Sequence, residues 1–304
     1  MRRLAAAVAL TLAAAPAARA QYAFRTLNVP GATATSVYGI NAVGQVVGTY
    51  QDAAGRSRGF VYTAGTYATF GAPGALGTVA QGINASGQVV GYYVSSEPVV
   101  SFLYAGGAYT PFSWPGFQLE THARGINAAG QIVGDYLRGS GMSYFGFHDV
   151  AGTFTTVVPP GASFSHAQGI NDAGQIVGYY GAPFALRGFL DVGGTYTTLD
   201  VPGASATQAN GLNNAGQIVG RYTGSAAAEH GFLYRAGVYA RLDVPGAVST
   251  AAFGINDAGR VVGTYQDAFG THGFLATPVP EPGTWIPVGA GLAGVGLLAR
   301  QRRA

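Results

Sequence analysis

Apolar residues recur along this chain in short stretches that are separated by turn residues. Within one segment the stretches are 165–171, 175–180, 187–190 and 195–201. They are rich in Val, Ile, Tyr, Thr and Phe, the residue types that favour strands. The turn Asp172-Ala173-Gly174 joins the first two stretches, and it suits a short hairpin because its glycine can adopt a positive φ. The pattern predicts an all-β fold of short antiparallel strands.

The same pattern returns six times at a nearly constant period. Each copy contains a version of Gly-Ile-Asn-x-x-Gly-Gln-Val/Ile-Val-Gly, and the asparagines of the six copies are Asn41, Asn84, Asn127, Asn171, Asn213 and Asn256. The steps between them are 43, 43, 44, 42 and 43 residues. A period in the low forties with four strands per copy is the size of a β-propeller blade.

The order of the stretches predicts how such a ring would close. Residues 24–31 match the fourth stretch alone, whereas the last copy ends with a third stretch at 272–275 and has no fourth. A leading strand that completes the last copy would leave no open strand edge. We therefore predict a six-bladed β-propeller over residues 21–278, closed by the N-terminal strand. A β-solenoid or another all-β array is the alternative.

The N-terminal residues 1–20 have the features of a secretory signal peptide. Arg2 and Arg3 precede an apolar run over 4–16, and Ala18-Arg19-Ala20 forms a cleavage site before Gln21. The sequence therefore predicts export; a buried N-terminal helix is the alternative.

The C-terminal residues 279–304 have a different character. Pro280-Glu281-Pro282 is followed by an apolar run over 285–299 and then by Arg300, Arg302 and Arg303. The run is shorter than the roughly 20 residues of a comfortable span, and the arginines would hold the end on the cytoplasmic side. We expect a short transmembrane helix here, with an ordinary tail anchor as the alternative to a processed signal.

The charge balance argues against a nucleic-acid partner. The net charge of the chain is +3, but six arginines lie in the two terminal segments. Between Gln21 and Pro280, ten arginines stand against twelve acidic residues, a net charge of −2. The repeat region therefore lacks the basic surface that nucleic-acid binding requires. The chain has no Cys, which excludes disulfides and Cys-based zinc sites.

Two resemblances follow from these motifs. The Gly-Ile-Asn-x-x-Gly-Gln and Gly-Phe-Leu-Tyr elements over residues 28–278 resemble HAF repeats of exported bacterial proteins, with departures at Leu212, Arg260 and Ser101-Phe102. The C-terminal Pro280-Glu281-Pro282, apolar run and arginine cluster resemble the PEP-CTERM sorting signal of Gram-negative bacteria. That resemblance implies that an exosortase removes the tail after a transient anchoring in the inner membrane. The protein would then pass to the cell surface or the exopolysaccharide matrix.

The variation among the copies predicts one face as the binding surface. The connection between the second and third stretches and the crossover after each Pro-Gly vary most, whereas the two tight turns keep their length. In a propeller the two variable connections lie on the same face, and variable loops on a rigid scaffold often bind ligands. Absence of any constraint on these loops is the alternative reading. Aromatic residues confined to single loops are the candidate ligand contacts: Trp114, Phe117, Tyr144, Phe184 and Phe269.

Other candidate chemistry is weaker. The histidines lie at strand positions that also hold Val, Phe or Arg in other copies, so we predict no metal site and no cofactor. Glu97, Glu120 and Glu229 lie in the variable connections and could form a carboxylate pair for glycoside hydrolysis. We predict no catalytic residue. The expected function is a non-enzymatic surface or matrix protein that binds exopolysaccharide or another matrix protein. The alternatives are a sugar-specific lectin and a polysaccharide hydrolase or lyase.

Overall fold

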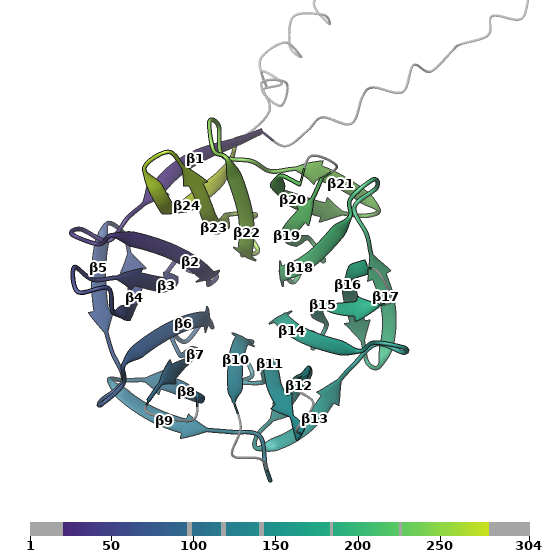
Figure 1. Cartoon of the computed structure of the whole chain (residues 1–304), viewed down its shortest axis with the longest axis horizontal. Helices are drawn as coiled ribbons and strands as arrows, with labels where there is room; N and C mark the ends of the chain where they lie inside the picture. Colours follow the sequence, from purple (N-terminus) through teal and green to yellow (C-terminus); the bar gives the residue numbers. More distant parts are fainter. Residues whose placement is uncertain are drawn as a thin grey trace, which may run out of the picture. The chain divides into compact units, whose positions relative to one another are not determined.

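A ring of β-strands makes up the folded part of the chain. The computed structural model describes residues 21–95, 99–116, 120–139, 143–182, 185–224 and 227–279. Within these ranges the chain forms twenty-four β-strands and no α-helix. Residues Ala23–Thr277 form one compact body, in which groups of four strands stand side by side around a central axis (Figure 1). The fold is a β-propeller.

Each group of four strands, called a unit below, runs from an inner strand at the axis to an outer strand at the rim. Unit 1 contains β2 (Ala34–Ile40), β3 (Val46–Gln51), β4 (Ser57–Thr63) and β5 (Thr66–Phe70), and unit 2 contains β6 (Gly77–Ile83), β7 (Val89–Val94), β8 (Val99–Ala105) and β9 (Ala108–Phe112). Unit 3 contains β10 (Thr121–Ile126), β11 (Ile132–Arg138), β12 (Ser143–Val150) and β13 (Thr153–Val157), and unit 4 contains β14 (Phe164–Ile170), β15 (Ile176–Ala182), β16 (Ala185–Val192) and β17 (Thr195–Leu199). Unit 5 contains β18 (Ala206–Leu212), β19 (Ile218–Thr223), β20 (Glu229–Arg235) and β21 (Val238–Arg241), and unit 6 contains β22 (Ser249–Ile255), β23 (Val261–Asp267), β24 (Gly270–Val279) and β1 (Gln21–Leu27).

The prediction of a six-bladed propeller is wrong. Hydrogen bonding leaves four separate four-stranded blades, which are units 1, 2, 3 and 6, and one continuous eight-stranded sheet that contains units 4 and 5. A parallel bridge between Leu186 of β16 and Ala206 of β18 joins the two halves of that sheet. The bridge lies near the end of the β15–β16 hairpin, whose strands pair as far as Ala182 and Ala185, where the first residue of β18 comes within hydrogen-bonding reach of β16.

The predicted terminal segments cannot be compared with the structure. The signal peptide over 1–20 and almost all of the sorting tail over 279–304, including its expected transmembrane helix, lie outside the described residues. Among the residues that are described, no helix is long and apolar enough to cross a membrane.

The two ends of the ring meet in unit 6. β1 is the outer strand of that unit and pairs with β24. Side chains support the pairing: the Thr26 and Tyr265 hydroxyls lie 2.9 Å apart, and the Phe24 and Phe274 rings pack edge to face at 5.7 Å. Strands from opposite ends of the chain thus complete one sheet.

A ring of asparagines joins the units through the turns that connect the first and second strands of each unit. The Asn41 side chain caps its own turn by accepting a hydrogen bond from Gln45 N at 2.9 Å, and its Nδ2 donates to the Asn84 carbonyl at 3.0 Å. The same donation links each repeat asparagine to the next, and Asn256 Nδ2 donates to the Asn41 carbonyl at 3.0 Å. The repeat asparagine therefore holds both its turn and the closed circle.

The glycine two residues before each repeat asparagine is required by close approach of the inner strands. A Cβ on Gly39 would lie 2.8 Å from the Gln81 carbonyl oxygen, and one on Gly211 would lie 2.4 Å from that of Phe253. Backbone therefore packs on backbone at the axis, where only glycine leaves room. A β-bulge occurs at this point in every inner hairpin.

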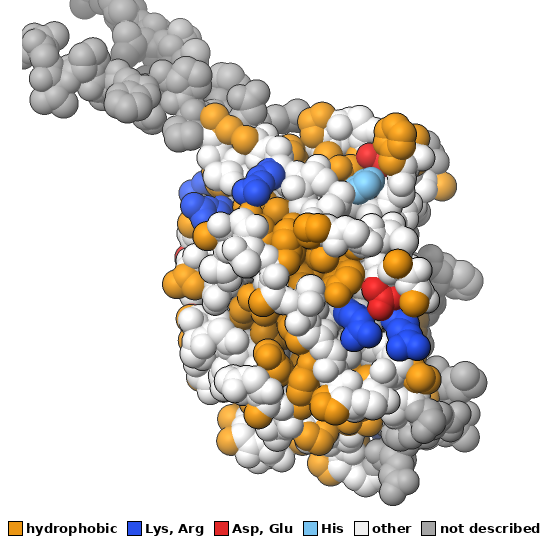
Figure 2. Space-filling model, turned by 90° about the vertical axis from the view of Figure 1, so that its left-hand side faces the viewer, with side chains coloured by type: hydrophobic (Ala, Val, Ile, Leu, Met, Phe, Trp, Pro, Cys, Tyr) orange, Lys and Arg blue, Asp and Glu red, His pale blue; other side chains and the backbone are white. Residues whose placement is uncertain are grey.

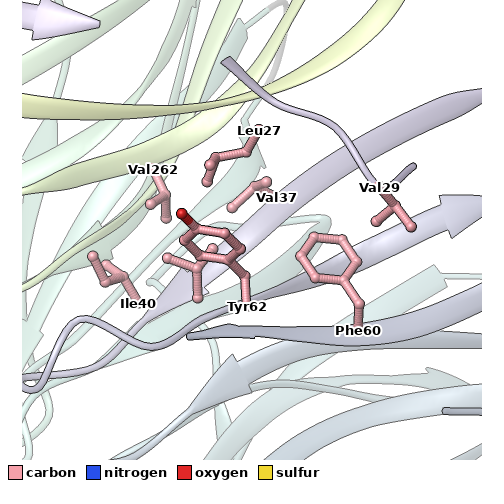
Figure 3. Close-up of a cluster of buried hydrophobic side chains, with 8 residues drawn as sticks. Leu27, Val29, Val37, Ile40, Phe60, Tyr62 and Val262 are labelled. Atoms are coloured by element: carbon pink, nitrogen blue, oxygen red, sulfur yellow. The ribbon is translucent and has the colours of Figure 1, made fainter. Parts of the chain in front are cut away.

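The core lies between neighbouring units, where aromatic residues that recur in every copy are buried. One phenylalanine of each third strand is fully buried: Phe60, Phe102, Phe147, Phe189, Phe232 and Phe274. Figure 3 shows one cluster, in which Phe60 and Tyr62 of β4 lie near Leu27 and near Val262 of β23. Each cluster therefore ties a unit to the one before it.

The outer strands are more exposed than the inner ones. In β5 every side chain is exposed or half-buried. Figure 2 views the rim of the ring from the side on which β5 lies in Figure 1, and hydrophobic side chains are gathered across it. Phe70 stacks on Tyr104 of β8 with 4.8 Å between ring centroids. The outer surface is therefore held partly by aromatic contacts that water reaches.

Candidate functional site

The two variable connections of each unit lie on one face, as predicted. The backbone N–H of Ser205 in the crossover before β18 donates to the Thr223 carbonyl at the end of β19 at 2.9 Å, and Val248 N donates to the Gln266 carbonyl at 2.7 Å in unit 6. Each crossover thus lies against the end of the second strand. We call this side the variable face and the opposite side, with the Asn-x-x-Gly turns, the turn face.

One pair of residues on each inner hairpin differs strongly between units. The members of the pair lie directly opposite each other on neighbouring strands, and in units 1 to 6 they are Ser36 and Thr49, Val79 and Tyr92, His122 and Asp135, His166 and Tyr179, Gln208 and Arg221, and Ala251 and Thr264. Units 6 and 1 therefore carry the smallest side chains. In units 2 to 4 each pair contains at least one ring, so the centre of the variable face is packed on one side and open on the other.

The packed side contains a polar cluster, defined by Glu120, His122, Arg124, Asp135, Tyr144 and His166. The Asp135 side chain is 0% exposed. Arg124 Nε lies 2.7 Å from its Oδ2, His122 Nδ1 lies 3.0 Å from its Oδ1, and His166 Nδ1 lies 3.3 Å from its Oδ2. The first two contacts are hydrogen bonds, whereas the His166 nitrogen is close but not aligned for one. Asp135 is thus enclosed by one cation and two imidazoles.

The outer layer of the polar cluster is reached by solvent. Glu120 Oε2 lies 4.0 Å from His122 Nε2 and accepts a hydrogen bond from the Tyr144 hydroxyl. The Tyr144 ring lies between the two imidazoles, with centroid distances of 5.5 Å to His122 and 5.6 Å to His166. A chain of polar groups therefore leads from buried Asp135 through His122 to the variable face.

The charges of the polar cluster stabilise each other. Burial by itself would raise the pKa of Asp135, but the Arg124 guanidinium and the two imidazoles outweigh it and hold that pKa well below its usual range. Burial and the hydrogen bond to Glu120 raise the pKa of Tyr144. Asp135 is therefore an anion and Tyr144 a neutral donor at any physiological pH.

The open side contains a cavity of about 210 Å³, called the axial cavity below. Its lining is Ser36, Tyr38, Arg221, Glu229, Ser249, Ala251, Phe253, Thr264, Tyr265, Gln266 and Thr271. Tyr38 and Phe253 pack edge to face at 5.1 Å, and Arg221 Nη1 lies 2.8 Å from Glu229 Oε1. The cavity exists because Ser36, Ala251 and Thr264 leave unfilled the space that larger side chains occupy in units 2 to 4.

The predicted ligand aromatics do not converge on one site. The Trp114 ring stacks on Tyr136 at 3.8 Å and belongs to the packing of unit 3. Tyr144 belongs to the polar cluster, and Phe269 is 91% exposed on the β23–β24 turn. Phe117 and Phe184 lie outside the described residues, as do all six residues of the predicted sorting signal: Pro280, Glu281, Pro282, Arg300, Arg302 and Arg303.

The predicted acidic residues are also separated. Glu120 is in the polar cluster and Glu229 pairs with Arg221 at the axial cavity, whereas Glu97 lies outside the described residues. Variation among the copies predicts a tolerant strand position for His122 and His166, and this prediction overlooks their convergence on Asp135. The sequence offers one signal of the cluster: the hairpin register places His122 opposite Asp135, and no other copy has an acidic residue at that position. Among the described residues no group of three or more His, Cys, Asp or Glu side chains is arranged to hold a metal ion.

Comparison with known proteins identifies the fold. No family model and no curated protein matches the sequence. Among solved structures, virginiamycin B lyase from Staphylococcus aureus is 12% identical over 85% of this chain and 100% of its own, with a TM-score of 0.51. The fucose-binding Aleuria aurantia lectin is 16% identical over 82% and 98%, with a TM-score of 0.50. The β-propeller domain of the Trilobed protease from Pyrococcus furiosus, which has an open velcro topology, is 9% identical over 86% and 99%, with a TM-score of 0.50. At these identities the likeness establishes that this chain has the β-propeller fold.

Proposed function

We propose that the protein is an exported, glycan-binding β-propeller and that the glycan binds in the axial cavity. The observation that supports this most directly is the lining of the cavity. Its lining includes Ser36, Ser249 and Thr271, which carry hydroxyl groups, and Tyr38 and Phe253, which carry aromatic rings. Sugars present hydroxyl groups at their edges and C–H groups on their faces, so they need both kinds of contact.

The Arg221–Glu229 pair adds directional recognition. Arg221 also donates from Nε to Gln208 Oε1 at 2.8 Å, so its guanidinium is held in position at the cavity. A fixed guanidinium and carboxylate can donate to and accept from neighbouring sugar hydroxyls with little loss of side-chain entropy. The shared fold is compatible with such a role, since the Aleuria aurantia lectin is solved with a fucose-containing disaccharide.

The cellular location that we propose rests on the two terminal segments. We propose that residues 1–20 direct export, that an exosortase removes the tail, and that the mature protein reaches the cell surface or the exopolysaccharide matrix of a Gram-negative bacterium. A matrix glycan is then the expected ligand. Protein recovered from the matrix should begin at Gln21 and lack Arg300, Arg302 and Arg303 in a mass measurement of its ends; retention of the intact chain in the cytoplasm would contradict export.

Filling the axial cavity should abolish glycan binding while preserving the fold. The substitutions Ala251→His and Thr264→Tyr copy the pair His166 and Tyr179 of unit 4, so the scaffold has a precedent for them. We expect at least a tenfold loss of affinity for the matrix glycan, about 1.4 kcal/mol, in calorimetric titration. Val43→Ser, at an exposed position on the turn face, is the control. Unchanged affinity of the filled variant would place the binding site elsewhere.

A second candidate function is supported by the polar cluster. The His122–Asp135 pair orients an imidazole whose Nε2 faces Glu120, an arrangement that suits general acid–base catalysis on a bound glycan. A hydrolase or lyase would shorten the matrix glycan during incubation, and Glu120→Gln should then reduce the rate by about 100-fold or more. A glycan of constant length would leave the protein as a binding module that is not an enzyme, which is the function we favour.

A further inference from the structure

The axial cavity narrows toward the axis. Tyr38 and Phe253 line both the cavity and the channel along the axis. Beneath them the channel along the axis holds about 80 Å³ and is bordered by the glycines at which the inner strands approach most closely. A glycan that enters the cavity therefore has no passage through the ring and must leave across the variable face.

The volume of the cavity suits a short part of a glycan. At about 210 Å³, it is smaller than the roughly 300–1,000 Å³ of pockets that enclose drug-sized ligands. A cavity of this size that narrows to a channel of about 80 Å³ admits the end of a chain more readily than an internal segment, which would have to enter and leave. The terminal sugar residue is thus the part that fits.

The charge of the cavity favours an uncharged sugar. Among the residues that line it, Arg221 and Glu229 carry charge, and they neutralise each other at 2.8 Å. The remaining polar groups are hydroxyls and the Gln266 amide. A uronate would bring a carboxylate against Glu229 without an unpaired cation to receive it, and loss of its hydration would not be offset.

Two exposed apolar side chains lie on chain segments that supply lining residues of the cavity. Val248 is 72% exposed and precedes the lining residue Ser249, and its N–H binds the backbone of the lining residue Gln266 at 2.7 Å. Phe269, which is 91% exposed, follows Gln266 by three residues on the β23–β24 turn. Asp267 fixes that turn by accepting hydrogen bonds from Phe269 N at 2.7 Å and from His272 at 3.1 Å. We call Val248 and Phe269 the apolar platform.

We propose that the ligand is a neutral glycan recognised at its chain end. The terminal residue enters the axial cavity, and the next residue lies on the apolar platform, with its C–H face against the Phe269 ring. This inference rests on the proposed glycan-binding function. The hydrogen bonds to Asp267 fix the turn that carries the Phe269 ring, between the lining residues Gln266 and Thr271, so a second sugar residue that packs on this ring is stabilised at small entropic cost.

The test is titration of the full-length protein with mono-, di- and trisaccharides of neutral hexoses and 6-deoxyhexoses, and with uronate-terminated counterparts. For the neutral series we expect affinity to increase from mono- to disaccharide. Phe269→Ala should lower disaccharide affinity about fivefold or more while leaving monosaccharide affinity unchanged. Leu76→Ala, which removes an exposed apolar side chain from the crossover of unit 2, is the control.

The outcomes separate this inference from the proposed function. Failure of every saccharide and of the matrix glycan to bind would overturn both. Binding that is equal for mono- and disaccharides, or that Phe269→Ala does not weaken, would overturn the platform and retain the glycan-binding function. Equal binding of uronate-terminated saccharides would overturn the preference for a neutral end. Loss of matrix-glycan binding after its chain ends are capped would support chain-end recognition, and unchanged binding would contradict it.

Discussion

Deletion of residues 21–31 should destabilise the whole ring. The deletion removes β1, whose Leu27 is 1% exposed, and also removes buried Val29. Burial of two such side chains contributes roughly 3–6 kcal/mol, which is a large share of the 5–15 kcal/mol that stabilises a typical domain. The deletion also exposes the edge of β24 and so invites aggregation. Thermal unfolding followed by circular dichroism should show a large fall in melting temperature or no cooperative transition.

Single substitutions separate strand pairing from side-chain burial in this experiment. Leu27→Ala keeps β1 but removes its most buried side chain, and we expect it to cost about 2–5 kcal/mol. Ala23→Ser, at an exposed position of the same strand, should change the free energy of unfolding by less than about 0.5 kcal/mol. A deletion variant that melts at the temperature of the intact protein would show that β1 is dispensable for ring stability.

Asp135→Thr should lower the free energy of unfolding more than removal of both Asp135 and Arg124 does. Thr is the residue that unit 1 carries at this position, so its size and shape are compatible with the fold. The substitution leaves the Arg124 guanidinium without its buried partner, which costs about 3–5 kcal/mol. The double variant Arg124→Gln/Asp135→Thr removes both charges and introduces Gln, which Gln81 and Gln168 provide at the corresponding positions of units 2 and 4.

Urea unfolding of the single and double variants measures this coupling. The double variant should recover most of the stability that Asp135→Thr loses, because no buried charge is left unpaired. A double variant that is no more stable than Asp135→Thr would mean that the carboxylate acts through contacts other than Arg124, such as those with His122 and His166.

The same pair predicts a dependence on acid. The pKa of Asp135 is lower in the folded protein than in the unfolded chain, so its contribution to stability is complete above its ordinary pKa of about 3.9. That contribution decreases as the pH falls below 4 and is lost once the pH passes below the folded pKa. The part of the stability difference between wild type and the double variant that Asp135 supplies should therefore be lost as the pH falls below about 4.

The polar cluster illustrates what repeat comparison can and cannot reveal. The alignment of copies shows that His122 and His166 occupy one repeat position and that this position tolerates Val79 and Ala251. Tolerance at a repeat position therefore does not exclude a role for the residue that one copy carries there. The structure brings His122 and His166 from neighbouring units to one carboxylate, and such a contact between copies is not visible when the copies are superimposed.

The axial cavity was not predictable for a related reason. It arises from the coincidence of small residues in units 6 and 1, which are far apart in sequence and adjacent only because the ring closes. Trp114 shows the converse: an aromatic residue confined to one crossover suggested a ligand contact, yet its ring is stacked on Tyr136. Only the tertiary structure shows whether such a ring packs against the protein or is free to contact a ligand.

The sequence alone determined the all-β propeller fold, the four strands per repeat and the face that carries the variable connections. It could do so because strand period, turn chemistry and repeat length are local properties. Tertiary structure decided the rest: the continuous sheet of units 4 and 5, the asparagine circle, the burial of Asp135 and the axial cavity. These features depend on contacts between units, which the chain brings together only when the ring closes.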